Sequence, residues 1–140
     1  MNHMAKPVTH HEALIYAMVT LSAADRAMTD KELMKMGDIV RTMPIFADFD
    51  PQKLVTVAEA CGRLLRDDDG LDAVLAIIKS SLPPRLHETL YACAVEVAAA
   101  DLHVEQEELV FLQMLRDELE LDDLITAAIE RSARVRYRVK

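Results

Sequence analysis

Residues 11–36 read HEALIYAMVTLSAADRAMTDKELMKM, and residues 87–112 read HETLYACAVEVAAADLHVEQEELVFL. The segments align without a gap. In each, an apolar stretch ends in Ala-Ala-Asp, and a Glu-Leu pair follows after six further residues. The shared polar positions are His11/His87, Glu12/Glu88, Asp25/Asp101 and Glu32/Glu108. The repeat predicts two similar helix–turn–helix units in a pseudo-twofold arrangement, with the two apolar helices at its centre.

The composition of the 140-residue chain favours helices over strands. Hydrophobic residues make up 51% of the chain and aromatic residues only 4%, so most apolar side chains are Ala, Leu, Val, Ile and Met. Three glycines and five prolines provide few turns for a hairpin-rich sheet protein. We therefore expect one all-α domain that is long enough to bury a hydrophobic core.

Cap residues and helix breakers predict about seven helices. The expected helices cover residues 10–24, 29–43, 51–66, 71–80, 84–100, 105–119 and 122–134. They lie in a single domain of residues 10–135. Residues 1–9 are interpreted as a disordered N-terminus or a cloning remnant, and residues 136–140 as a basic C-terminal tail.

The net charge of −8 is distributed unevenly along the chain. Residues 131–140, RSARVRYRVK, contain five basic residues and no acidic one, so the first 130 residues carry a net charge of −13. A body this acidic argues against nucleic-acid binding and suits divalent cations or basic partners. The basic segment either contacts an anionic membrane surface or an acidic partner, or is a helix end whose cations complement the helix dipole.

Cys61 and Cys93 both lie in apolar helical patterns, and the start of the sequence does not resemble an export signal. We therefore expect two reduced, buried thiols in a cytoplasmic protein. No apolar run reaches the roughly 18–20 residues that a membrane-spanning helix needs, so the sequence predicts no transmembrane segment.

Two acidic pairs recur at the turns of the repeat: Asp25 with Glu32, and Asp101 with Glu108. In each pair the Asp ends one helix and the Glu lies in the first turn of the next. A tight turn between the helices can bring the two carboxylates close together. Hard cations such as Ca²⁺ and Mg²⁺ bind oxygen ligands of this kind. The pairs are therefore candidate metal ligands.

A structural role explains the same acids without a metal. Glu32 follows Thr29 at the spacing of a capping box, and acids near the start of a helix complement its dipole. The acids that would complement a helix dipole are Glu105, Glu107 and Glu108. The Asp of each pair is a common turn residue at a helix end. The spacing alone leaves both interpretations open.

The segments SAADRAMTDKEL (22–33) and AAADLHVEQEEL (98–109) resemble the paired acidic turns of the TerB (tellurite-resistance) family, and the resemblance covers nearly the whole chain. The broader group includes the N-terminal domain of a membrane-tethered DnaJ-like co-chaperone. The resemblance implies an all-helical TerB-like fold, no catalytic activity and a bound divalent metal, with Ca²⁺ or Mg²⁺ favoured. The metal ligands that it implies are Asp25, Glu32, Asp101 and Glu108.

The sequence departs from the family pattern directly after each Asp. The family typically has Gly there, where a positive φ angle is easy for the backbone. This chain has Arg26 and Leu102 instead. The turns are therefore expected to be rebuilt, and Arg26 offers a charge that can neutralise an acid in place of a metal.

The DDDG segment at residues 67–70 contains calcium-type ligands but lacks the rest of an EF-hand loop. With Gly70 at its sixth position, such a loop would begin at residue 65 and end at residue 76, which are Leu and Ala. The segment is therefore interpreted as a solvated turn whose Asp69 caps the next helix.

Histidine-based and catalytic sites have little support in the sequence. His11 and His87 are interpreted as surface or packing residues, because the histidines and cysteines lack the spacing of a zinc site. The sequence offers no local Ser/His/Asp or Cys/His pairing and no glycine-rich phosphate loop.

Two hypotheses for the function follow from the sequence. The first is a metal-binding adaptor in tellurite resistance or a related stress response, working at the cytoplasmic face of the membrane with other tellurite-resistance components. The second is a metal-free protein–protein interaction scaffold whose repeated acids serve as helix caps and surface charge. An enzyme has only generic carboxylates in its favour.

Overall fold

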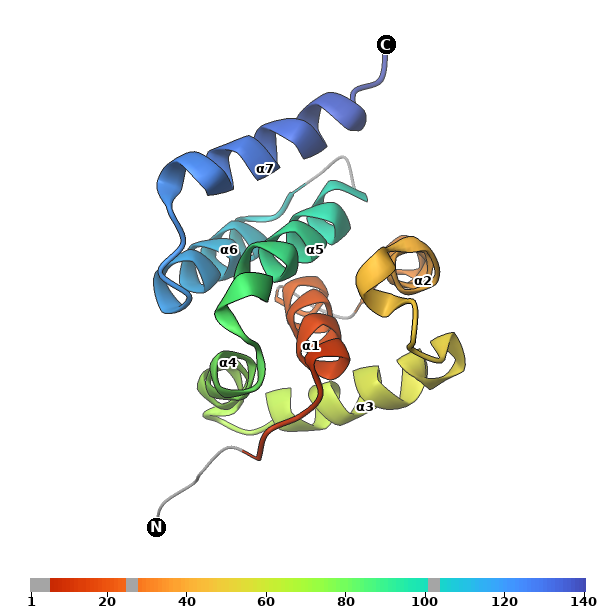
Figure 1. Cartoon of the computed structure of the whole chain (residues 1–140), viewed down its shortest axis with the longest axis vertical. Coiled ribbons are helices and arrows are strands. Elements are labelled where there is room, and N and C mark those ends of the chain that lie inside the picture. The colour runs from red at the N-terminus through yellow and green to blue at the C-terminus, as the bar shows by residue number, and fades with distance from the viewer. Residues whose placement is uncertain (1–5, 25–27, 101–103) are drawn as a thin grey trace.

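The computed structural model describes residues 6–24, 28–100 and 104–140. These residues form seven α-helices and three short 3₁₀ helices, and none of them is in a strand (Figure 1). The α-helices are α1 (His10–Ser22), α2 (Asp30–Thr42), α3 (Leu54–Leu65), α4 (Gly70–Ser81), α5 (His87–Ala100), α6 (Gln106–Glu118) and α7 (Asp123–Arg136). The 3₁₀ helices are η1 (Pro44–Phe46), η2 (Pro51–Lys53) and η3 (Pro84–Leu86). The prediction of an all-α fold with seven helices is confirmed.

Helix α1 is the centre of the core. Its sequence is apolar on nearly every side, and side chains such as Leu14, Ile15 and Met18 are fully buried. Helices α3, α4 and α5 pack around it (Figure 1). A helix with apolar side chains all round must be enclosed by its neighbours, and this explains the central position of α1.

The two repeated segments form the same pair of elements. Each gives a largely buried helix, α1 or α5, and then a helix with an apolar and a polar side, α2 or α6. The central helices α1 and α5 pack against each other, α2 packs mainly against α5, and α6 contacts both. Each half of the repeat therefore helps to cover the central helix of the other half.

Two helices begin differently from the prediction. Residues 51–53 and 84–86 were expected to be α-helical, but each forms a 3₁₀ turn that leads into α3 or α5. Both turns begin at a proline, whose fixed φ angle and missing N–H suit the start of a helix. Asp50 accepts a hydrogen bond from the backbone N–H of Gln52 and so caps the first of these turns.

The turn between α3 and α4 is shaped by Gly70 rather than by a capping side chain. Asp69 occupies the N-cap position of α4, but its side chain makes no capping hydrogen bond, so this part of the prediction is wrong. Its φ and ψ angles of −100° and 20° differ from the extended conformation that normally aims an N-cap side chain at the helix N–H groups. A Cβ atom at Gly70 would lie 2.3 Å from the carbonyl oxygen of Leu64.

Both cysteines are buried free thiols, as predicted. Cys61 on α3 faces α1, where its Sγ lies 3.5 Å from Thr20 Oγ1. Burial raises the pKa of Cys61 to about 11 and that of Cys93 to about 12. Among the described residues, no helix is both long and apolar enough to span a membrane.

Neither thiol is expected to react with a water-soluble disulfide reagent at pH 8 while the protein is folded. Burial blocks access to both sulfur atoms, and the raised pKa values keep them protonated. In denaturant both thiols should react rapidly. Absorbance of the released chromophore gives the two rates, and fast labelling of the folded protein would contradict this packing of α3 and α5.

Candidate functional site

Two of the four predicted metal ligands lie in the described part of the chain. Glu32 and Glu108 occupy matching places in the first turns of α2 and α6, and each residue is only 3% exposed. Asp25 and Asp101 lie outside the described residues. Carboxylates are rarely this buried without a specific interaction, so the contacts of the two glutamates matter.

Glu32 completes a reciprocal capping box at the start of α2. The backbone N–H of Thr29 donates to Glu32 Oε1 at 2.9 Å, and the backbone N–H of Glu32 donates to Thr29 Oγ1 at 3.2 Å. The Thr29 hydroxyl also donates to Glu32 Oε1, at 3.1 Å. The capping role proposed for this pair is confirmed.

Glu108 caps α6 in the corresponding way. Its Oε1 accepts a hydrogen bond of 3.1 Å from the backbone N–H of Glu105, the N-cap residue. Neither Glu32 nor Glu108 belongs to a cluster of three or more potential metal-binding side chains within the described part of the chain. In the structure, both glutamates thus act as helix caps.

Replacing Glu32 by Gln is expected to reduce the free energy of unfolding by about 1 kcal/mol or less, because the amide oxygen can still accept the Thr29 N–H. Glu32→Ala removes that acceptor and should cost more, about 1–2 kcal/mol. Urea unfolding of both variants provides the measurement. A loss of several kcal/mol in Glu32→Gln would mean that the negative charge itself holds the turn.

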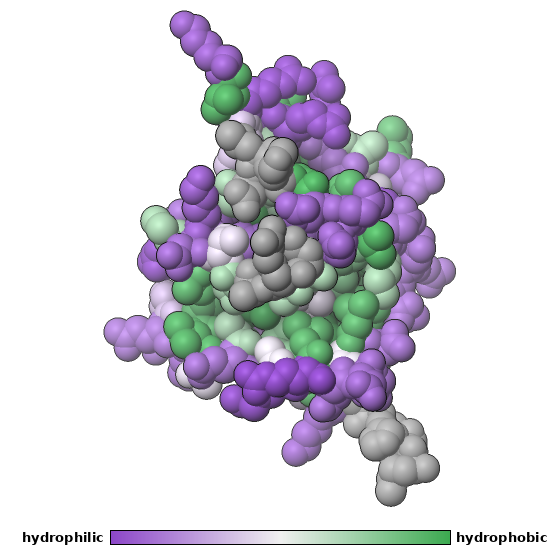
Figure 2. All heavy atoms as spheres, turned by 180° about the vertical axis from the view of Figure 1, so that it is seen from behind, coloured by the Kyte–Doolittle hydropathy of each residue, from purple (hydrophilic) through white to green (hydrophobic). Residues whose placement is uncertain are grey.

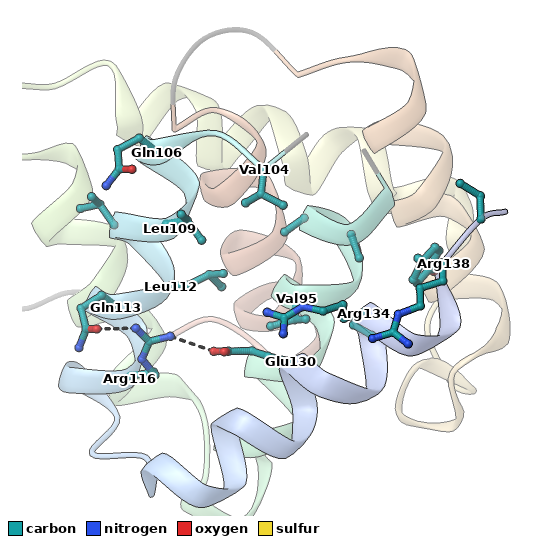
Figure 3. Close-up of a pocket in the computed structure, with 16 residues that line it drawn as sticks. Val95, Val104, Gln106, Leu109, Leu112, Gln113, Arg116, Glu130, Arg134 and Arg138 are labelled. Carbon is teal, nitrogen blue, oxygen red and sulfur yellow. Dashed lines mark hydrogen bonds and ion pairs between the residues drawn. The ribbon is translucent and has the colours of Figure 1, made fainter. Parts of the chain in front are cut away.

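A hollow lies between α6 and α7, with α5 as its floor (Figure 3). Its volume is about 810 Å³. We call it the α6–α7 groove. Its apolar lining comes from all three helices and the segments beside them: Val95, Ala98, Ala99, Val104, Leu109, Val110, Leu112, Ala133 and Val139. A concave, largely apolar surface with a few polar groups is typical of a binding site.

A partly buried polar network closes one end of the α6–α7 groove. Arg116 on α6 donates to Glu130 Oε2 on α7 at 2.9 Å and to the Tyr91 hydroxyl on α5 at 2.7 Å. Tyr91 donates to the same Glu130 oxygen, and Gln113 contacts the other side of Arg116 (Figure 3). Burial raises the pKa of Tyr91 to about 12, with the Glu130 hydrogen bond acting in the same direction. The network joins the three helices.

A second network fastens the C-terminal end of α7. The Tyr137 hydroxyl donates to Glu96 Oε2 on α5 at 2.7 Å, and Arg136 forms an ion pair with the same carboxylate. Lys35 on α2 lies 3.7 Å from Glu96 Oε2 and 4.8 Å from the centre of the Tyr137 ring. Burial acts to raise the pKa of Glu96, but the hydrogen bonds from Arg136 and Tyr137 outweigh it and lower the pKa.

Glu96→Gln is expected to reduce stability by about 1–3 kcal/mol at pH 7 and by much less at pH 3. The folded-state pKa of Glu96 is lowered, so its contribution is fully present above the unfolded value of about 4.3 and is lost as the pH falls through the folded value. Urea unfolding at the two pH values tests this. An equal loss at both would show that the charge of Glu96 does not hold α7.

The middle of α7 spans the α6–α7 groove without filling it. Only Thr126 and Ala133 of this helix are buried. The polar networks at Glu130, near the middle of α7, and at Tyr137, just past its end, add to its attachment to α5. Arg134 and Arg138 are exposed on the rim, and within the described part of the chain neither forms an ion pair. The groove therefore combines an apolar floor with a basic rim.

The outer apolar face of α6 borders a second hollow. This hollow, of about 510 Å³, lies between α6, the end of α1 and the α3–α4 junction, and it shares Gln106 and Val110 with the α6–α7 groove. Figure 2 shows hydrophobic side chains gathered across the middle of the rear face, with hydrophilic ones along its edges. Leu109 and Val110 are each about half exposed between the two hollows.

A family model described as tellurite resistance protein TerB matches residues 11–131. The chain belongs to the TerB family. The match extends over both halves of the internal repeat and most of α7. No curated protein and no solved structure matches the sequence significantly. The family resemblance seen in the two acidic turns is thus confirmed.

The α6–α7 groove of this TerB-family chain was not predicted from the sequence. The polar networks beside it contain hydrogen bonds between distant residues, Tyr91 with Glu130 and Glu96 with Tyr137. The partners are about 40 positions apart in the chain and share no local motif. Two sequence signals pointed toward it. These are the run of four apolar residues at 109–112, LVFL, in α6, and the alternating basic and apolar residues of the C-terminal segment.

Proposed function

We propose that this TerB-family protein is a non-catalytic protein-binding module whose α6–α7 groove receives an amphipathic helix with acidic flanks. The observation that carries the proposal is the groove itself. It is an apolar hollow of about 810 Å³, and the rim residues without an ion-pair partner among the described residues are basic, on a chain whose net charge is −8. An amphipathic helix lying in an apolar groove is a common mode of peptide recognition.

The apolar part of the proposal rests on side chains that the fold leaves exposed. Leu109 is 48% exposed on the wall of the α6–α7 groove, and Val104 and Val139 are exposed beside it. Large apolar side chains grouped in a hollow mark an interaction surface more often than scattered ones do. The apolar face of a bound helix would remove them from water.

The positive charge of the rim determines which charges a partner helix can carry beside its apolar face. Arg134 and Arg138 face solvent at the edge of the α6–α7 groove, whereas Glu130 is already paired with Arg116. A partner helix with Glu or Asp beside its apolar face would pair with the exposed arginines. A helix with basic flanks would be repelled. Charges at an interface edge act mainly on partner choice and association rate.

A labelled synthetic peptide tests the proposal. The probe is an amphipathic helix of about 18 residues with Leu on one face and Glu on both flanks. The peptide is expected to bind with a Kd of roughly 10–100 μM, within the range of weak protein–peptide complexes. The same peptide with Lys in place of Glu should bind at least tenfold more weakly. Equal binding of both peptides, or no binding of either, would contradict the proposal.

A second candidate function is the binding of a divalent metal by Asp25, Glu32, Asp101 and Glu108, in an adaptor for tellurite resistance or a related stress. The burial of Glu32 and Glu108 at matching places in the repeat favours it, because a nearby cation offsets the cost of burying a carboxylate. Carboxylate oxygens fit Ca²⁺ or Mg²⁺ in kind. The hydrogen bonds to Oε1 of each glutamate support helix capping without a metal.

Calorimetry distinguishes metal binding by Glu32 and Glu108 from helix capping alone. Metal-stripped protein is titrated with Ca²⁺ and with Mg²⁺, and the double variant Glu32→Gln, Glu108→Gln is the comparison. Saturable binding that the double variant loses would support the metal adaptor. Absence of binding to the unaltered chain, or unchanged binding by the variant, would leave both glutamates as caps.

A further inference from the structure

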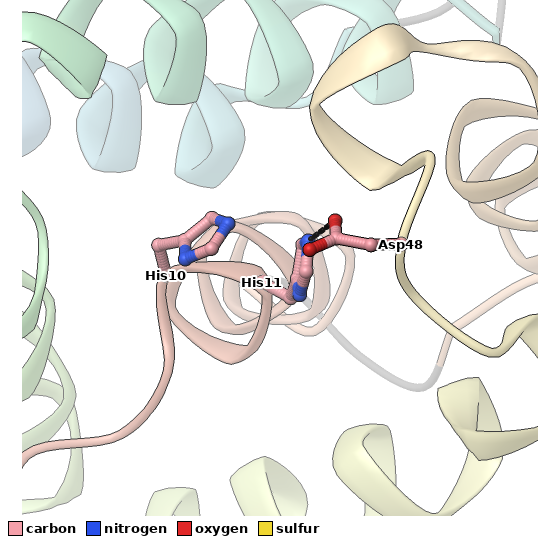
Figure 4. A group of neighbouring side chains, drawn as sticks. All are labelled: His10, His11 and Asp48. Atoms are coloured by element: carbon pink, nitrogen blue, oxygen red, sulfur yellow. Dashed lines mark ion pairs between the residues drawn. The ribbon is translucent and has the colours of Figure 1, made fainter.

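A compact group of ligand-type side chains lies away from the α6–α7 groove, where α1 begins. The potential ligand atoms of His10, His11 and Asp48 all lie within 4.8 Å of one another (Figure 4). His10 and His11 are in the first turn of α1, and Asp48 follows η1, so the group joins segments nearly 40 residues apart. None of the three lines the α6–α7 groove.

The surrounding structure fixes the two histidines. A reciprocal capping box sets the start of α1: the backbone N–H of Glu12 donates to Thr9 Oγ1 at 3.1 Å, and that of Thr9 donates to Glu12 Oε1 at 2.9 Å. The buried His11 ring then stacks on Phe46, with centroids 5.6 Å apart. The His10 ring lies 4.0 Å from that of His11. The site therefore has a rigid centre.

Two oxygens compete for a single nitrogen at this centre. His11 Nε2 lies 2.9 Å from the carbonyl oxygen of Ile45 and 3.0 Å from Asp48 Oδ1. A neutral imidazole carries at most one proton on that nitrogen, so it cannot donate a full hydrogen bond to both oxygens. A cation coordinated by the Nε2 lone pair and by Asp48 would give the carboxylate a partner that does not depend on this one proton.

We propose that His10, His11 and Asp48 form a binding site for a divalent transition-metal ion of the Zn²⁺ class. Two imidazoles and one carboxylate are ligands that Zn²⁺, Ni²⁺ and Cu²⁺ prefer, whereas Ca²⁺ and Mg²⁺ prefer oxygen alone. The site is thus different in chemistry from the acidic turns. His11 would bind through Nε2 with its proton on Nδ1.

The geometry needs only small movements to accept the ion. Metal–ligand distances of about 2.0–2.2 Å in a tetrahedral site place the ligand atoms about 3.4 Å apart. The present atoms lie within 4.8 Å, and the Asp48 side chain, which is 82% exposed, has room to adjust. Three protein ligands leave one coordination position for water or for a ligand from another molecule.

Zinc titration of the metal-stripped full chain tests the proposal by calorimetry. One Zn²⁺ per chain is expected to bind, and Asp48→Asn and His10→Gln should each weaken binding at least tenfold. These variants avoid the buried His11 ring and its contacts with Phe46. His87→Gln, at the repeat position that matches His11, and Asp67→Asn, an exposed acid, are the matched controls and should bind as the unaltered chain does.

A thermal melt of the same proteins provides the second measurement. A saturating concentration of Zn²⁺ should raise the melting temperature of the unaltered chain and of Glu32→Gln, but not that of Asp48→Asn or His10→Gln. Equal Ca²⁺ should have no such effect through these residues. The proposal is overturned if Zn²⁺ gives no saturable heat, or if Asp48→Asn and His10→Gln both bind like the unaltered chain. The three residues then only tie the η1 segment to α1.

Discussion

Leu109→Asp is expected to weaken binding of the acidic-flanked peptide at least thirtyfold. Leu109 stands on the wall of the α6–α7 groove, where the apolar face of a bound helix would cover it. An Asp there places a charge against apolar side chains, and its negative sign also repels the acidic flanks. A central hot-spot contact is worth about 2 kcal/mol or more, which is about thirtyfold in Kd.

The control for Leu109→Asp is the same change at Leu124. Leu124 is on α7, is 78% exposed and does not line the α6–α7 groove. Fluorescence anisotropy of the labelled peptide should show less than a twofold change for Leu124→Asp. Both variants should stay folded, because neither leucine is part of the buried core. Equal effects of the two substitutions would rule out Leu109 as a specific contact.

Gly70→Ala is expected to lower the free energy of unfolding by about 2–4 kcal/mol. The added Cβ would lie 2.3 Å from the Leu64 carbonyl oxygen and 2.8 Å from Leu65 Cα. Both neighbours are backbone atoms, so the end of α3 or the start of α4 must move. Differential scanning calorimetry should show a decrease in melting temperature of roughly 10 °C.

Gly62→Ala makes the same chemical change with the opposite expected result. No atom outside the helix backbone lies within 4 Å of a Cβ at Gly62, which is inside α3. Alanine has the higher helix propensity, so this variant should be stabilised by about 0.5–1 kcal/mol. If both alanine variants unfold at the same denaturant concentration as the unaltered chain, the described α3–α4 turn is wrong.

The fold was largely predictable because its signals are local. The all-round apolar pattern of α1 required a central position, and the spacing of Thr29 and Glu32 predicted the capping box that starts α2. The prediction for Asp69 was wrong because residue type alone does not give backbone angles. The crowding at Gly70 controls this turn instead.

The candidate sites were less predictable because they depend on how distant helices meet. Glu32 and Glu108 were found from the repeat, since their spacing is local and occurs twice. The α6–α7 groove exists because Glu96 and Glu130 fix the position of α7. The group around His11 exists because the chain after η1 places Asp48 beside the start of α1. No local sequence pattern predicts which of these distant residues come into contact.

The most direct measurement of the central claim is amide chemical-shift mapping by NMR during titration with the acidic-flanked peptide. Saturable shifts are predicted for residues that line the α6–α7 groove, such as Leu109, Leu112 and Ala133, and for the rim at Arg134. Residues of α3 should be unaffected. Shifts confined to α3 and α4, or spread evenly over the surface, would contradict the claim that this groove is the binding site.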